Sequence, residues 1–170
     1  MTKDSYRTLK LNIISAKDLK DANIFSKMSV FAAVSISGDP YSKQLTNTHY
    51  YPHSGRNPTW NFPIKFTINE SLAKKNRLFL KVKLLSYNKF LPWNATIGTI
   101  YIPLKELLGN PAAAGHQISY QVKKKPSHKS KGTLNLSYKF GDRVKGPTTK
   151  KAAKNDESDL YFMWQILMVM

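Results

Sequence analysis

Hydrophobic and polar residues alternate along short stretches of this chain, which predicts β-strands that each bury one face. The clearest stretch covers residues 59–68, where a large apolar side chain stands at every second position: Trp60, Phe62, Ile64, Phe66 and Ile68. Successive side chains of a strand point to opposite faces, so these five share one face and polar residues share the other. A strand with one apolar and one polar face is typical of an antiparallel sheet.

The same alternation extends along most of the chain. Strands are expected at 8–14, 28–37, 42–50, 60–68, 77–85, 96–102, 117–122 and 132–140. A helical turn around Leu72 and a short helix over 104–108 interrupt them, and Gly109-Asn110-Pro111 stops that helix. Short strands at this spacing, joined by loops rich in Gly, Pro and Asn, predict an all-β sandwich or barrel.

The composition changes after Gly141, which predicts one domain over 1–141 and a distinct segment over 142–170. Residues 142–154 contain five basic residues among Gly, Pro and Thr, as in a flexible basic linker. Residues 160–170 carry no charge but are too short to span a bilayer, which needs about 20 apolar residues. Three interpretations of this tail stay open: it folds back onto the sandwich, it lies in a membrane interface, or it results from an incorrect reading frame.

The chain is strongly basic, with 27 Lys and Arg against 10 Asp and Glu, a net charge of +17. Such an excess attracts polyanions over a Debye length of about 8 Å, so the candidate partners are an anionic membrane, nucleic acid or an acidic protein. Without cysteine, disulfides and thiolate metal sites are excluded, which fits a reducing, cytoplasmic compartment. Residues 1–5 lack an apolar region, so no secretory signal is expected.

Several segments together resemble the C2 domain family, over about residues 6–141. They are Ser15-Ala16-Lys17-Asp18-Leu19, Asn57-Pro58-Thr59-Trp60-Asn61, Ile97-Gly98 and the last strand. The runs 27–39 and 132–140 are similar to small plant C2 proteins associated with cold and defence responses. This resemblance implies an eight-stranded antiparallel sandwich that docks to phospholipid membranes, with or without Ca²⁺, and sometimes to partner proteins.

The resemblance does not extend to the calcium ligands. Calcium-binding members of the family supply about five aspartates from two loops, and the corresponding positions here are Asn23, Ser29, Tyr87, Lys89 and Ala95. Ca²⁺ needs six to eight oxygen ligands, mostly carboxylates, whereas Lys89 would repel a cation. Asp18 and Asp21 are interpreted as ordinary loop aspartates. We therefore expect no metal site and no cofactor.

Every second connection of an antiparallel sandwich lies at the same end, so the loops 15–27, 51–57, 87–95 and 123–131 are expected to cluster. Apolar side chains at two of the loop tips are costly unless they bury in something, and tryptophan favours a membrane interface. The candidate lipid-binding residues are these tips and the basic side chains around them: Ile24, Phe25, Lys27, Arg56, Lys89, Phe90, Leu91, Trp93, Lys123, Lys124, Lys125, Lys129 and Lys131.

An apolar tip surrounded by lysine predicts calcium-independent docking to anionic phospholipids, peripheral at the plasma membrane or endomembranes. Each basic residue near such a surface contributes about 1 kcal/mol, and each buried Phe or Trp about 1.5–3 kcal/mol. Two alternatives stay open: Phe25 and Trp93 fold inward and cap the sandwich, or the same end recruits a signalling protein. A second basic surface could combine Lys43 and Lys65 with the pair Lys81 and Lys83, although scattered exposed lysines fit better.

The remaining function classes are disfavoured. Catalysis needs convergent titratable groups, whereas the histidines are spread along the chain, and no metalloprotease helix, nucleophile elbow or phosphate loop is present. We therefore expect no enzyme. Nucleic acid is a rival partner for so basic a chain, and Tyr50, Tyr51 and Trp93 could stack on bases. No nucleic-acid-binding motif is present, however, and the aromatic residues fit the inward faces of a sandwich better.

Overall fold

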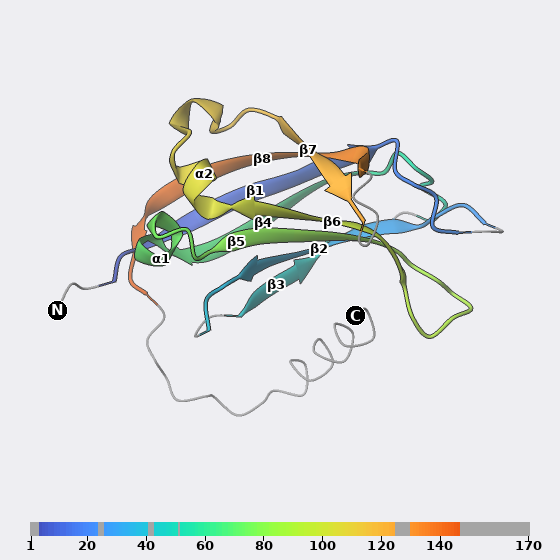
Figure 1. Ribbon diagram of the computed structural model, residues 1–170, viewed down its shortest axis with the longest axis horizontal. Helices are drawn as coiled ribbons and strands as arrows, with labels where there is room; N and C mark the ends of the chain where they lie inside the picture. The colour runs from blue at the N-terminus through green and yellow to red at the C-terminus, as the bar shows by residue number, and fades with distance from the viewer. Residues whose placement is uncertain (1–3, 24–25, 41–42, 51, 125–129, 147–170) are drawn as a thin grey trace.

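The computed structural model describes residues 4–23, 26–40, 43–50, 52–124 and 130–146 (Figure 1). One antiparallel sheet of eight strands, in the order β3-β2-β5-β6-β7-β8-β1-β4, curls into a sandwich. Its strands are β1 (Tyr6–Lys17), β2 (Val30–Ser37), β3 (Gln44–Asn47), β4 (Thr59–Asn69), β5 (Phe79–Ser86), β6 (Ala95–Pro103), β7 (Ile118–Lys123) and β8 (Ser130–Val144). The short helices are α1 (Glu70–Lys74), α2 (Leu104–Leu108) and a 3₁₀ turn (Pro111–Ala113). The expected all-β fold with short helical segments is confirmed.

The sheet folds over so that β3-β2-β5-β6 and β4-β1-β8-β7 form its two layers. At one side the layers are joined between β6 and β7 through the pair Thr99 and Lys123. At the other side the Gln44 side chain of β3 bridges to β4: its Nε2 donates to the Thr67 oxygen at 2.7 Å, and its Oε1 accepts from the Thr67 nitrogen at 2.8 Å. A side-chain amide thus satisfies main-chain groups at the edge of β4.

The inward faces form one apolar core, as the alternation predicts. In β4 the buried residues include Trp60, Ile64, Phe66 and Ile68, and β2 and β5 contribute every second residue in the same way. The Trp60 Nε1 donates to the Val30 oxygen at 3.2 Å, so the one polar atom of a buried indole is satisfied.

Strand β8 continues past the end expected at Phe140. Arg143 and Val144 pair with Arg7 and Tyr6 of β1, so the first residues of the expected linker belong to the sheet. Long-range pairing with the start of β1 is the reason, since a charged sequence read alone gives no sign of a partner strand.

Glu70, at the start of α1, holds together the end of the sheet where β1 begins and β8 ends. Its side chain is only 6% exposed, and its carboxylate contacts Ser5 Oγ at 3.0 Å, Arg143 Nε at 3.3 Å, Lys74 Nζ at 3.5 Å and Arg7 at 3.8 Å. Burial alone would raise the pKa of Glu70, but the hydrogen bond from Ser5 and the proximity of Arg143 and Lys74 outweigh it, so the pKa is lowered.

Replacing Glu70 with glutamine is expected to lower the free energy of unfolding by about 1–2 kcal/mol at neutral pH, because charge-assisted hydrogen bonds are lost to partly exposed cations. Since the folded-state pKa is lowered, this contribution is present above the ordinary carboxyl pKa of 4.5 and is lost as the pH falls through the folded value. Urea denaturation of both proteins along a series of decreasing pH should show their difference shrinking in acid. A difference in the free energy of unfolding that does not change with pH would contradict the assignment of a lowered pKa to Glu70.

Candidate functional site

The described residues of the loops 15–27, 51–57 and 87–95, and the residues on either side of 125–129, lie at one end of the sandwich, opposite α1 and α2 (Figure 1). Main-chain hydrogen bonds join the first three: Leu19 donates to Arg56 at 3.1 Å, Gly55 to Met28 at 2.9 Å, and Tyr87 to Ser29 at 2.9 Å. The start of β8 packs beside the first loop. A Cβ at Gly132 would lie 2.8 Å from the Lys17 oxygen, and its φ of +88° also favours glycine.

Among the described residues of this end, those of the loop 87–94, hereafter the apolar loop, include the most exposed apolar side chains. Phe90 is 90% exposed, Trp93 55% and Leu91 46%. The alternative in which Trp93 folds inward to cap the sandwich is therefore wrong. Phe25 and Ile24 of the first loop lie outside the described residues.

Two asparagine side chains fix the shape of the apolar loop. The Asn88 Oδ1 accepts from the main-chain nitrogens of Phe90 at 2.9 Å and Leu91 at 3.2 Å, and the Asn94 Oδ1 accepts from the nitrogen of Asn88 at 3.3 Å. Asparagine is well suited to such turns, because its short side chain reaches main-chain groups a few residues away. The loop thus holds its apolar tip away from the domain through its own hydrogen bonds.

A stacked tyrosine pair stands at the base of the apolar loop. Tyr50, which follows β3, and Tyr87 have ring centroids 4.7 Å apart with planes inclined by 16°, and both rings are exposed. From the sequence, Tyr50 is only a possible base-stacking residue, because nothing in the pattern shows that it meets Tyr87. The pair extends the aromatic surface of this end.

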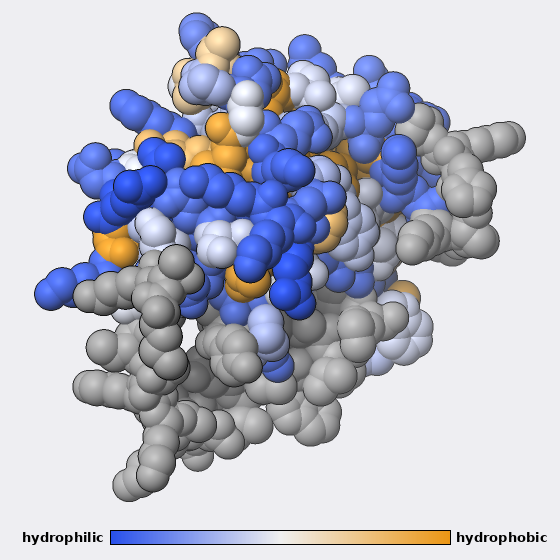
Figure 2. Space-filling view, turned by 60° about the vertical axis from the view of Figure 1, so that its left-hand side comes forward, coloured by the Kyte–Doolittle hydropathy of each residue, from blue (hydrophilic) through white to orange (hydrophobic). Residues whose placement is uncertain are grey.

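Exposed large hydrophobic side chains concentrate at the loop end. Of the seven in the described part of the chain, five belong to the apolar loop and the tyrosine pair: Tyr50, Tyr87, Phe90, Leu91 and Trp93. Figure 2 brings the opposite end, with α1 and α2, forward, and hydrophilic residues cover most of the surface drawn in colour there. The two ends of the molecule therefore differ in chemistry.

Basic side chains surround the apolar surface. Among the candidates, Lys27, Arg56, Lys89, Lys123, Lys124 and Lys131 are exposed at this end, while Lys125 and Lys129 lie outside the described residues. The Arg56 Nε donates to the Leu19 oxygen at 2.7 Å, which fixes the guanidinium beside the first loop. The cations therefore come from four different segments of the chain.

The positions that correspond to calcium ligands are occupied by groups with other roles. The Asn23 Nδ2 donates to Ser26 Oγ at 3.2 Å and to the Lys27 oxygen at 3.3 Å, and the Ser29 Oγ accepts from the His53 nitrogen at 3.1 Å. Among the residues that the structure describes, no three His, Cys, Asp or Glu lie close enough to hold a metal ion. Ca²⁺ takes six to eight oxygen ligands, mostly from carboxylates, and these amide and hydroxyl side chains supply no carboxylate.

The second basic surface considered from the sequence is not a single surface. Lys65 lies on β4, in the layer opposite to β5, which carries Lys81 and Lys83. The Lys81 Nζ lies 5.7 Å from the ring centroid of Tyr101. Burial, and then the charge of Lys81, lower the pKa of Lys83. The proposed grouping was wrong for Lys65, since face alternation alone does not assign a strand to a layer.

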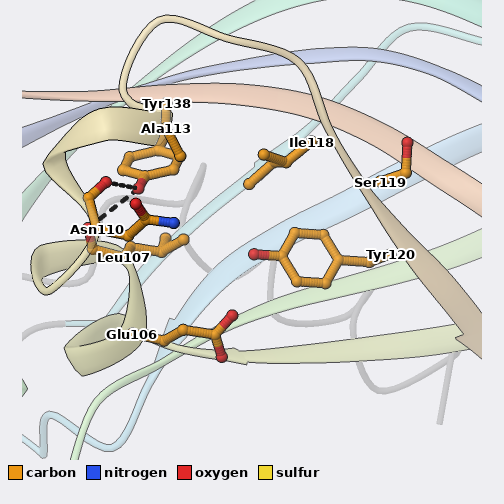
Figure 3. A pocket seen from close by; sticks show the side chains of 8 residues that line it. All are labelled: Glu106, Leu107, Asn110, Ala113, Ile118, Ser119, Tyr120 and Tyr138. Carbon is orange, nitrogen blue, oxygen red and sulfur yellow. Dashed lines mark hydrogen bonds between the residues drawn. The ribbon is translucent and has the colours of Figure 1, made fainter.

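A cavity of about 290 Å³ lies away from the loop end, between α2, the 3₁₀ turn and β7 (Figure 3). Its lining includes Glu106, Ile118 and Tyr120, whose hydroxyl points into it. Burial, and then the Glu106 carboxylate and Tyr138, raise the pKa of Tyr120 to about 12. The Tyr138 hydroxyl donates to the main-chain oxygens of Asn110 at 2.8 Å and Leu107 at 3.1 Å. Burial, and then the Glu106 carboxylate, also raise the pKa of Tyr138. Both phenols therefore stay protonated at neutral pH, and that of Tyr138 anchors α2 to the sheet.

The sequence matches a protein family and is similar to two plant proteins. The family model for the C2 domain matches residues 7–135. Protein SRC2 of Glycine max is 57% identical over 153 residues, which cover 88% of this chain and 52% of the soybean protein. The SRC2 homolog of Arabidopsis thaliana is 36% identical over 138 residues, covering 81% of this chain and 41% of its own length. The chain spans about half the length of these curated relatives.

Solved structures of low sequence identity share the fold. C2 domain A of plant Extended Synaptotagmin 1 superposes with a TM-score of 0.63 at 16% identity, over 85% of this chain and 97% of that one. A structure of Extended-Synaptotagmin 2 that contains its SMP domain and two C2 domains gives a TM-score of 0.57 at 16% identity, over 85% and 30% of the two chains. C2 domains are in general non-catalytic modules that dock to membranes or proteins. In the described part of this chain, no helix is long and apolar enough to cross a bilayer.

Replacing Asn88 with alanine is expected to loosen the tip of the apolar loop, because it removes the acceptor of two main-chain hydrogen bonds. Backbone ¹⁵N order parameters at Phe90 and Leu91 should fall from about 0.85 toward about 0.6 or lower. The matched variant Asn88→Asp keeps an acceptor oxygen and should retain the wild-type values. Unchanged order parameters in the alanine variant would show that other contacts hold the tip.

Proposed function

Because the chain belongs to the C2 domain family, we propose that it docks without calcium to anionic phospholipid membranes through its loop end. The observation that carries this proposal is the apolar loop: Phe90 and Trp93 are exposed, hydrogen bonds from the main chain of Phe90 and Leu91 to Asn88 fix the tip, and basic side chains lie at the same end. A preformed loop loses less conformational entropy on binding than a flexible one.

The approximate energies of the individual contacts support reversible binding of the loop end to an anionic membrane. Insertion of Phe90 and Trp93 contributes about 1.5–3 kcal/mol each, and each lysine or arginine near an anionic surface about 1 kcal/mol. Four or five such contacts correspond to a dissociation constant in roughly the micromolar range, once the cost of association is considered. Attraction through Lys27, Arg56 and Lys89 would precede the shallow insertion of the aromatic rings.

Three further parts of the proposal rest on the residue types and on the family resemblance. Calcium independence is supported by the amide, hydroxyl and lysine side chains at positions where calcium-binding relatives carry aspartates. A role as an adaptor rather than an enzyme agrees with the general behaviour of C2 domains. The resemblance of residues 27–39 and 132–140 to plant C2 proteins of cold and defence responses supports a place in stress or defence signalling. The absence of cysteine agrees with a location at the cytoplasmic side of the plasma membrane or of endomembranes.

A second candidate function is a scaffold that recruits a signalling protein through the same end. The stacked pair of Tyr50 and Tyr87 favours it, because tyrosine and tryptophan are enriched at protein interfaces. Both functions use the same aromatic surface, so only the choice of partner distinguishes them.

The double variant Phe90→Ala/Trp93→Ala is expected to bind anionic vesicles at least about tenfold more weakly than the wild type, because two insertion contacts are lost. Co-sedimentation with vesicles of phosphatidylcholine, alone or mixed with phosphatidylserine, measures this. Tyr101→Ala removes an aromatic ring of similar exposure from β6 and should bind as the wild type does.

Each arm of this experiment tests one part of the proposal. Binding to the mixed vesicles should be equal with calcium and with a chelator, and weaker to phosphatidylcholine alone. A wild-type chain that binds neither kind of vesicle would overturn the membrane function and leave the scaffold function. Binding that appears only with calcium would overturn calcium independence.

A further inference from the structure

Three lysines stand side by side across the outer face of the layer β4-β1-β8. Lys10 of β1 pairs directly with Lys65 of β4 on one side and with Lys139 of β8 on the other. All three are exposed, and their strand neighbours Leu9, Leu11, Ile64, Phe66 and Tyr138 are buried, so the lysines point away from the core. We refer to Lys65, Lys10 and Lys139 as the lysine row.

The lysine row concentrates positive charge without internal compensation. Directly paired residues of neighbouring strands have Cβ atoms about 5 Å apart, and like charges at such positions destabilise a sheet. In the described part of the chain, the ion pairs all converge on Glu70, and none includes a member of the row. The next positions on the same face carry the short side chains Asn12, Pro63 and Ser137, which leave the lysines accessible.

The lysine row is too far from the loop end to share its membrane. Lys10 precedes the end of β1 at Lys17 by seven residues, about 23 Å along a strand. Electrostatic attraction between exposed groups falls off over about 8 Å at physiological salt. A domain docked by its loop tips, as the proposed function has it, therefore holds the row away from the bilayer and open to another molecule.

We propose that the lysine row binds an acidic, extended segment of a partner protein while the loop end is docked. Charge complementarity identifies the partner as a segment rich in Asp or Glu. In an extended segment, alternate side chains lie on one face about 7 Å apart. The three lysines stand on neighbouring strands about 4.8 Å apart, so successive carboxylates on that face of the segment can each reach one ammonium group. The long, flexible side chains of lysine accommodate the difference in spacing.

Fluorescence anisotropy with a labelled peptide of repeated Glu-Ser dipeptides tests this site. The full chain should bind this peptide and not a Gln-Ser peptide of the same length. The triple variant Lys10→Gln/Lys65→Gln/Lys139→Gln should bind it about tenfold more weakly. The control variant Lys75→Gln/Lys105→Gln/Lys145→Gln removes the same charge from exposed positions outside the row and should bind almost as the wild type does.

Vesicle co-sedimentation of the same proteins separates this proposal from the proposed function. The row variant should bind mixed phosphatidylcholine–phosphatidylserine vesicles nearly as well as the control variant, and unfold at the same or a higher temperature because like-charge pairs are removed. Equal loss of peptide binding in both variants would show a general effect of net charge and overturn the site. Failure of the wild type to bind the peptide, or loss of vesicle binding in the row variant alone, would overturn it as well.

Discussion

Antiparallel pairing is the constraint on which the rest of this molecule depends. Because the chain reverses at each connection, three loops and the start of β8 come to one end, while α1 and α2 come to the other. The apolar inner faces, with Trp60 bonded across the core to Val30, hold the two layers in this arrangement. The separation of an apolar, aromatic end from the charged cluster around Glu70 follows from strand direction, and the sequences of the loops then give each end its chemistry.

Strand positions and loop clustering could be predicted because they depend on local patterns. Alternation fixes which residues of a strand face the core, and strict reversal fixes which connections share an end. The sequence also places Phe90 and Trp93 at a loop tip, but it leaves the direction of Trp93 open, because an aromatic ring there can either cap the sandwich or point outward.

Features that depend on register between distant strands could not be predicted. The row of Lys65, Lys10 and Lys139 exists only because three strands far apart in sequence align at one level, and a one-residue slip would break it. The continuation of β8 likewise depends on β1 and on Glu70. The tyrosine pair and the hydrogen bonds of Asn88 depend on loop conformations, which periodicity does not encode.

The two cationic surfaces act independently at physiological salt. Their separation of about 23 Å exceeds the screening length of about 8 Å, so an anion at one surface changes little at the other. The net charge of +17 is therefore better regarded as local fields with separate ranges than as one field around the molecule. Such an arrangement allows one small domain to contact two anionic partners without competition between them.

The bridge from Gln44 to Thr67 has a consequence for the behaviour of the protein in concentrated solution. β3 and β4 are the two ends of the sheet order, and exposed strand edges are templates for pairing between molecules. On β4 the Gln44 amide occupies both main-chain groups of Thr67, and Pro63 has no N–H to offer. A continuous hydrogen-bonded ladder cannot form along this edge, so the β4 edge is protected against the edge-to-edge addition of another molecule.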